Sequence, residues 1–213
     1  MTNLNKIKVV VLGSPRVGKS AVTVRYLTKR YIGEYSSTSD FLYRHNVTFD
    51  NVTTEVEILD TSKCAKTGCL YEHLRWGDAF VVVYSICDRN SFADASEYLL
   101  QLSKLKLPSY YTTLLLGNKR DLDHSRQITV NDGHELSFHY SCQFYEVSAA
   151  ENYAGVSLAF QSLLREARSA QLLRALPIRR KLGVNSVSKA LGNIFGKNNN
   201  NKGDRKKRPS LSI

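Results

Sequence analysis

Short apolar runs alternate with amphipathic stretches along most of the chain. Three runs are apolar almost throughout, at Ile7–Leu12, Ala79–Ile86 and Thr112–Gly117, and Phe144–Val147 is a shorter run of the same kind. Such runs are typical of strands that are covered on both faces of a sheet. Helical spacing of apolar residues fills the intervals between them, at Lys19 to Arg30, Ser91 to Leu105, Thr129 to Tyr140 and Val156 to Leu173. This alternation predicts an α/β fold with a mostly parallel sheet and helices on both faces.

Two further strands are predicted in the first third of the chain. Arg44–Asp50 and Thr53–Asp60 have strand-like composition and flank a turn at Asp50-Asn51. In the second of them, Val56 and Ile58 alternate with charged residues, which favours one more buried face. The expected sheet therefore has six strands.

Length and charge divide the chain into a domain and a tail. The chain has 213 residues, enough for one self-sufficient core plus an extension. Ten of its 30 Lys and Arg residues lie from Arg179 onward, and Asp204 is the one acidic residue there. We therefore expect a nearly neutral domain at 1–176 and a basic, largely disordered tail at 177–213, in which apolar spacing favours a short amphipathic helix at 186–196.

The same features set expectations for location. No secretory signal and no apolar run of about 20 residues is visible, and cysteines are sparse, so a cytoplasmic protein is expected. The basic run Arg205–Arg208 leaves nuclear import, weak contact with an anionic membrane, or no partner as alternatives, whereas specific nucleic-acid binding is not expected. The segment Ser210–Ile213 has no cysteine, so prenylation is not expected. Whether Ser210 is phosphorylated stays open.

The segment between the first apolar run and the first helix has the spacing of a phosphate-binding loop. Gly13 is followed after four residues by Gly18-Lys19-Ser20. Glycines let backbone N–H groups approach a phosphate, and the helix N-terminus adds positive potential there. In this motif the lysine reaches the β- and γ-phosphate oxygens, and the hydroxyl of Ser20 ligates Mg²⁺. The loop predicts a nucleoside triphosphate site without specifying the base.

A second motif specifies the base. Asn118-Lys119-Arg120-Asp121 follows a buried strand. A carboxylate at Asp121 can accept hydrogen bonds from N1–H and the 2-amino group of guanine, whereas adenine would leave it unpaired. Asn118 is expected to join the loops of the site, and Lys119 to pack over the base. Farther on, Ser148 and Ala149 follow another strand, where the Ala149 N–H is expected to face guanine O6.

These motifs, in this order, resemble those of the small GTPases of the Ras superfamily. The resemblance covers Lys6 to Leu173 and is strongest for the branch of the Ras-related and estrogen-regulated growth inhibitor and its Ras-like relatives. Val24–Tyr35, Arg75-Trp76-Gly77, Asn118–Gln127 and Tyr145–Asn152 carry it. The resemblance implies a single P-loop G domain, binding of GTP and GDP with Mg²⁺, and a monomer whose switch loops contact protein effectors and regulators.

Specific roles follow from position in this family. The resemblance implies that Thr38 ligates Mg²⁺ and senses the γ-phosphate, that Asp60 holds Mg²⁺ through water, and that Tyr31 and Tyr35 lie against the guanine and the phosphates. The resemblance also implies catalytic roles for Lys19 and Thr38, and it makes Cys64 a degenerate catalytic position. The expected metal ligands are Ser20, Thr38 and Asp60. The full set of expected nucleotide-binding residues is Gly13, Ser14, Pro15, Arg16, Val17, Gly18, Lys19, Ser20, Ala21, Tyr31, Tyr35, Thr38, Asp60, Lys63, Asn118, Lys119, Asp121, Ser148, Ala149 and Ala150.

Several residues depart from the family pattern. Cys64 stands where a glutamine orients the attacking water, and a thiol is too short to replace that amide. Lys63 replaces a glycine beside it, and Pro15 and Arg16 occupy positions that are often glycine. Ala150 replaces a lysine beside the base. We therefore expect a signalling switch with slow intrinsic GTP hydrolysis; the alternative is a nucleotide-bound interaction module, a pseudo-GTPase, with negligible hydrolysis.

Overall fold

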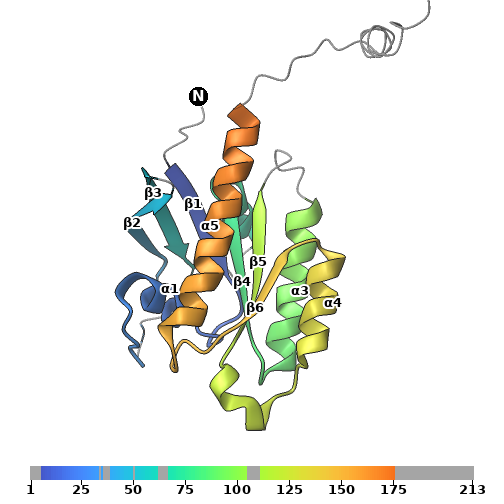
Figure 1. Cartoon of the computed structure of the whole chain (residues 1–213). Helices are drawn as coiled ribbons and strands as arrows, with labels where there is room; N and C mark the ends of the chain where they lie inside the picture. Colours follow the sequence, from blue (N-terminus) through green and yellow to red (C-terminus); the bar gives the residue numbers. More distant parts are fainter. Residues whose placement is uncertain are drawn as a thin grey trace, which may run out of the picture. The chain divides into compact units, whose positions relative to one another are not determined.

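A six-stranded sheet in the order β2-β3-β1-β4-β5-β6 forms the centre of the fold (Figure 1). The computed structural model describes residues 6–33, 35, 39–49, 51–61, 67–104 and 111–175. β2 pairs with β3 in antiparallel fashion, and every other neighbouring pair is parallel. The strands are β1 (Lys6–Leu12), β2 (Phe41–Phe49), β3 (Val52–Asp60), β4 (Ala79–Ser85), β5 (Thr112–Asn118) and β6 (Gln143–Glu146). The predicted α/β class and six-stranded, mostly parallel sheet are confirmed.

Helices cover both faces of this sheet, because successive side chains of a strand point to opposite sides. Val9 and Val11 of β1 belong to one core with α1 and α5, whereas Val10 and Leu12 belong to the other with α2 and α3. The helices are α1 (Lys19–Thr28), α2 (Thr67–Trp76), α3 (Arg89–Lys104), α4 (Val130–His139) and α5 (Tyr153–Ala175), with a 3₁₀ helix, η1 (Arg120–Ser125). Thr129 and Asp132 form a capping box at the start of α4.

The structure differs from the predicted elements at several places. The sequence analysis predicted neither α2 nor η1. β2 begins three residues before the predicted Arg44, because its pairing with β3 extends to Phe41 opposite Asp60. Glu57 lies on the face that we expected to be exposed, yet it is buried. Its carboxylate accepts from Lys6 at 2.7 Å and Arg44 at 3.1 Å, and these partners on neighbouring strands allow its burial.

The described residues all lie within the expected domain at 1–176. The expected tail and its helix at 186–196 lie outside them. Among the described helices, none combines the length and apolar character needed to cross a membrane.

Candidate functional site

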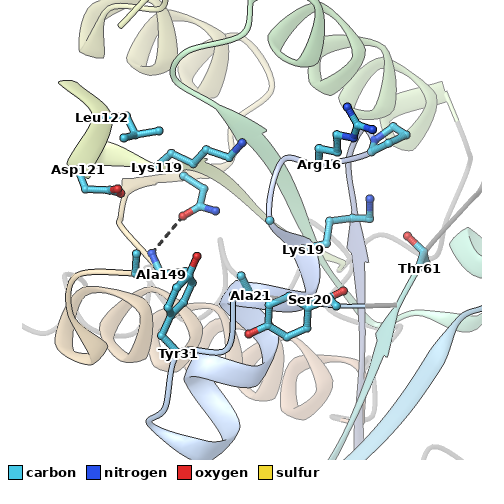
Figure 2. A pocket seen from close by; sticks show the side chains of 16 residues that line it. Arg16, Lys19, Ser20, Ala21, Tyr31, Thr61, Lys119, Asp121, Leu122 and Ala149 are labelled. Carbon is cyan, nitrogen blue, oxygen red and sulfur yellow. Dashed lines mark hydrogen bonds between the residues drawn. The ribbon is translucent and has the colours of Figure 1, made fainter. Parts of the chain in front are cut away.

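The loops that follow β1, β5 and β6 enclose one cavity of about 470 Å³ with α1 and the residues after it. A cavity at the carboxyl ends of the strands is the usual ligand site of an open α/β sheet. Figure 2 shows Lys19, Ser20 and Thr61 toward one end and Asp121 and Ala149 toward the other. Its lining residues are Pro15, Arg16, Gly18, Lys19, Ser20, Ala21, Tyr31, Gly33, Tyr35, Thr61, Asn118, Lys119, Asp121, Leu122, Ala149 and Ala150.

The loop after β1 depends on its two glycines. Gly13 and Gly18 have φ values of +145° and +97°, which residues with a Cβ rarely adopt. A Cβ on Gly13 would lie 2.3 Å from the Val83 carbonyl oxygen, and one on Gly18 would lie 2.3 Å from Nδ2 of Asn118. The glycines therefore permit both the turn and its close contact with β4 and β5.

Lys19 lies in the floor of this loop and is 7% exposed. Its ammonium donates to the carbonyl oxygens of Gly13 at 2.9 Å and Ser14 at 3.0 Å. These bonds hold a buried cation at the start of α1, where the helix dipole adds to its positive potential. The arrangement suits a polyanionic ligand.

Between the glycines, Pro15 and Arg16 form the exposed part of the loop. Arg16 has a φ of +66°, a left-handed conformation that costs a residue with a Cβ on the order of 1 kcal/mol. Its side chain lies at the rim of the cavity (Figure 2). The position therefore combines backbone strain with a cation beside the predicted phosphate site.

Asn118 at the end of β5 joins two loops and is 2% exposed. Its Nδ2 donates to the Val17 carbonyl at 2.9 Å, and its Oδ1 accepts from the Ala149 N–H at 3.2 Å. The first contact is the joining role expected from the sequence. The second contact gives the Ala149 N–H a partner in the protein (Figure 2), and its expected contact with guanine O6 stays a prediction.

The Asp121 carboxylate at the far end is oriented by a neighbouring loop. Its Oδ1 accepts from the Ser148 hydroxyl at 2.5 Å, and the Ser148 oxygen accepts from the Glu151 N–H at 3.0 Å. The loop after β6 thus fixes one carboxylate oxygen of Asp121. Asp121 is the second residue of η1, whose N-cap Lys119 has a left-handed conformation, and it lines the cavity.

Apolar and aromatic groups line the same end of the cavity. Lys119 and Leu122 lie on one side, and Tyr31 lies on the other, with 48% of its surface exposed. Tyr35 also lines the cavity, and its hydroxyl accepts from the Ile32 N–H at 3.2 Å. Flat and apolar walls beside a single oriented carboxylate match a planar, polar-edged base.

A buried carboxylate lies at the phosphate end. Asp60 at the end of β3 is 2% exposed, and its Oδ1 has no hydrogen-bond partner among the described residues. Burial raises the pKa of the Asp60 carboxyl, while a hydrogen bond from Ser20 and the charge of Lys19 offset part of the rise. The next residue, Thr61, donates its hydroxyl to the Val11 carbonyl at 2.6 Å, which ties this segment to β1. An unpaired carboxylate oxygen beside a hydroxyl fits a hard cation such as Mg²⁺.

An ion pair behind the cavity, which the sequence analysis did not identify, joins η1 to β6. Arg126 donates to both carboxylate oxygens of Glu146, at 2.8 and 2.9 Å. It also contacts Asp123 at 2.7 Å and the Ile128 carbonyl at 2.9 Å. η1 follows Lys119, and β6 precedes Ser148. This ion pair therefore supports both loops at the end of the cavity where we expect the base to bind.

Most of the predicted site residues meet at this cavity. Gly13, Ser14, Val17, Asp60 and Ser148 lie behind its lining. Thr38, Lys63 and Cys64 lie outside the described residues. The structure adds Gly33, Thr61 and Leu122 to the lining. No motif marks these three residues. The sequence could have indicated them only by their positions, since they lie next to predicted site residues and two of them directly follow Asp60 and Asp121.

Comparison with known proteins agrees with this arrangement. A sequence model of the Ras family matches residues 8–169. The human Ras-related and estrogen-regulated growth inhibitor is 38% identical over 197 residues, which cover 92% of this chain and 98% of that protein. The bovine Ras-related and estrogen-regulated growth inhibitor-like protein is 38% identical over 201 residues, which cover 91% of this chain and 98% of that protein. The mouse GTP-binding protein Rit2 is 35% identical over 170 residues, covering 79% and 78%. The chain therefore belongs to the Ras family.

Proposed function

We propose that this chain is a Mg²⁺-dependent switch that binds GTP and GDP and hydrolyses GTP slowly. The observation that carries the proposal is the single cavity with Lys19 at one end and Asp121 at the other. A buried, oriented cation suits the β- and γ-phosphates, and an oriented carboxylate suits the N1–H and 2-amino group of guanine. Family membership supports the same ligand.

The residues at the phosphate end would hold the metal. Ser20 and Asp60, with Thr38, are the proposed ligands, Asp60 through water; the unpaired Oδ1 of Asp60 supports this choice. When bound there, Mg²⁺ would supply positive charge that offsets the charge of the phosphates. Lys19 would stabilise the negative charge that develops on the γ-phosphate as water attacks it.

We propose slow hydrolysis because this chain differs from the family pattern at positions that assist the reaction. Cys64 offers no amide to orient the attacking water. Pro15 adds a rigid ring at the rim of the cavity, where an arginine from a regulatory protein would approach. The proposed consequence is a long-lived GTP state that effectors and regulators contact through the segments around Thr38 and between Asp60 and His73.

Identification of the bound nucleotide tests the binding proposal. The full-length protein is purified with Mg²⁺, and the extracted nucleotide is identified by chromatography before and after chelation. Guanine nucleotide that is released faster on chelation is expected. As a matched test, Asp121→Ala should weaken GDP binding by roughly a hundredfold or more. Recovery of no guanine nucleotide, or unchanged affinity in that variant, would contradict the proposal.

Single-turnover hydrolysis separates the switch from the pseudo-GTPase. Wild type and Cys64→Gln are loaded with GTP, and phosphate release is followed in Mg²⁺. Slow release in the wild type and a clear gain in Cys64→Gln would support a switch limited by that residue. No release from either protein would support the interaction module, which Lys63, Cys64 and Pro15 favour.

The tail carries proposals of its own. We propose a domain at 1–176, a basic tail at 177–213, and a cytoplasmic monomer. The alternatives for the tail are weak contact with anionic membrane, binding to an import receptor, and no partner. Salt-dependent binding of the full chain to vesicles containing anionic lipid tests the membrane contact. Binding that is equal with neutral lipid would contradict it.

A further inference from the structure

One contact joins the phosphate loop to α3. The Ser14 hydroxyl donates to Oδ2 of Asp94 at 2.5 Å, across 80 positions of sequence. Ser14 is buried, whereas Asp94 is exposed and lies in the second turn of α3. A hydroxyl-to-carboxylate bond of this length is charge-assisted and about twice as strong as a neutral one. The contact therefore fixes the loop against a helix that does not line the cavity.

The loop has a physical need for such an anchor. Pro15 has no N–H with which to secure the turn, and Arg16 is held in a left-handed conformation. Ser14 and Val17 bracket these two residues. The Val17 carbonyl is held by Asn118 from β5, so Asp94 supplies the hold at the opposite end of the strained segment.

The anchor also leads directly to the phosphate-binding cation. The Ser14 carbonyl accepts from the ammonium of Lys19 at 3.0 Å. A change in the position of Ser14 therefore moves one of the two carbonyl oxygens that hold Lys19. Asp94, Ser14 and Lys19 form a continuous series of contacts from α3 to the floor of the loop.

We propose that Asp94 is a positioning residue for the phosphate loop, acting through the Ser14 hydroxyl to slow release of nucleotides that carry a β-phosphate. The inference rests on the proposed guanine-nucleotide function and adds a control point on α3. Asp94 acts on the loop, without touching the ligand. A ligand that lacks the β-phosphate should gain little from it, because Lys19 serves the β- and γ-phosphates.

Release of labelled GDP from the full-length protein in Mg²⁺ tests the proposal. Ser14→Ala and Asp94→Ala should each speed release by about five- to tenfold, which is less than loss of a buried charge-assisted hydrogen bond would give because Asp94 is exposed to solvent. The double variant should be no faster than either single one, since both remove the same contact. Asp94→Asn keeps an acceptor oxygen but loses the charge, so it should speed release by only about two- to threefold.

Two controls separate positioning from a general loss of structure. Glu97→Ala on the exposed face of α3 removes a surface contact with Gln101 and should leave GDP release unchanged. Affinity for GMP, measured by competition, should change less than about twofold in Ser14→Ala and Asp94→Ala, because GMP has no β-phosphate.

Three results would overturn the inference. They are additive effects in the double variant, an equal loss of GMP and GDP, or wild-type GDP release in Ser14→Ala. If Asp94→Ala does not fold, Ser14→Ala still tests the second and third of these results. A wild-type protein that binds no GDP would overturn the proposed function as well. Normal GDP binding with unchanged release in Ser14→Ala would refute only the positioning role of Asp94.

Discussion

Replacing Arg126 by methionine should destabilise the domain and weaken its base end together. Glu146 is 8% exposed at its side chain and Arg126 is 18% exposed, so the variant leaves a buried carboxylate without its partner. Removing one member of such a pair costs about 3–5 kcal/mol. The contact with the exposed Asp123 adds at most about 0.5 kcal/mol. We therefore expect a loss of about 3 kcal/mol in the free energy of unfolding.

Thermal and denaturant unfolding of the GDP-bound protein measure this loss. For a domain of this size, about 3 kcal/mol lowers Tm by roughly 6–12 °C. GDP release should also be faster in Arg126→Met, since η1 and β6 then lose the contact that holds Asp121 and Ser148 in place. Arg165→Met, at an exposed position of α5, is the matched control and should change the free energy of unfolding by less than about 0.5 kcal/mol.

A second variant distinguishes the ion pair from the volume of the side chain. Arg126→Met combined with Glu146→Leu replaces both charges by apolar groups, and its stability should return to within about 1 kcal/mol of wild type. The reasoning is refuted if Arg126→Met costs less than about 1 kcal/mol, or if the double variant is as unstable as the single one.

Three further substitutions test the phosphate loop and the metal end. Gly18→Ala should lower the free energy of unfolding by about 3 kcal/mol, because its Cβ would lie 2.3 Å from Asn118 and the backbone has a positive φ. Gly155→Ala is the control and should cause no such loss, because the nearest atom to its Cβ is 3.5 Å away. Equal losses for the two variants in chemical denaturation would contradict this. Arg16→Gly should raise the free energy of unfolding by about 0.5–1 kcal/mol, because glycine relieves the backbone strain at this position. Arg16→Ala keeps the strain, so equal Tm values for the two variants would argue against strain at Arg16. Asp60→Asn should be more stable than wild type in chelator at neutral pH. Because the folded-state pKa of Asp60 is raised, wild type loses stability as pH rises through that pKa, and the advantage of Asn should fade toward pH 4; a pH-independent difference in Tm would refute this.

Much of the site was predictable because its residues follow strands directly. Gly13 to Ser20 after β1 and Asn118 to Asp121 after β5 are local motifs at the ends of buried apolar runs. In a parallel sheet these ends lie along one edge, so the order of elements alone brings the motifs together. The helix α2 was missed although its apolar residues have helical spacing, because it is only ten residues long and includes Gly68, a residue that disfavours a helix.

The sequence alone therefore determined the α/β class, the six strands and the two ligand-binding motifs, because apolar periodicity and loop chemistry are properties of neighbouring residues. The tertiary structure decided the pairs that join distant residues: Ser14 with Asp94, Arg126 with Glu146, and Glu57 with Lys6 and Arg44. It also decided that the Ala149 N–H serves Asn118. The physical reason is that most polar groups are buried only where folding supplies a partner, and no local pattern in a sequence specifies which distant residue that partner will be.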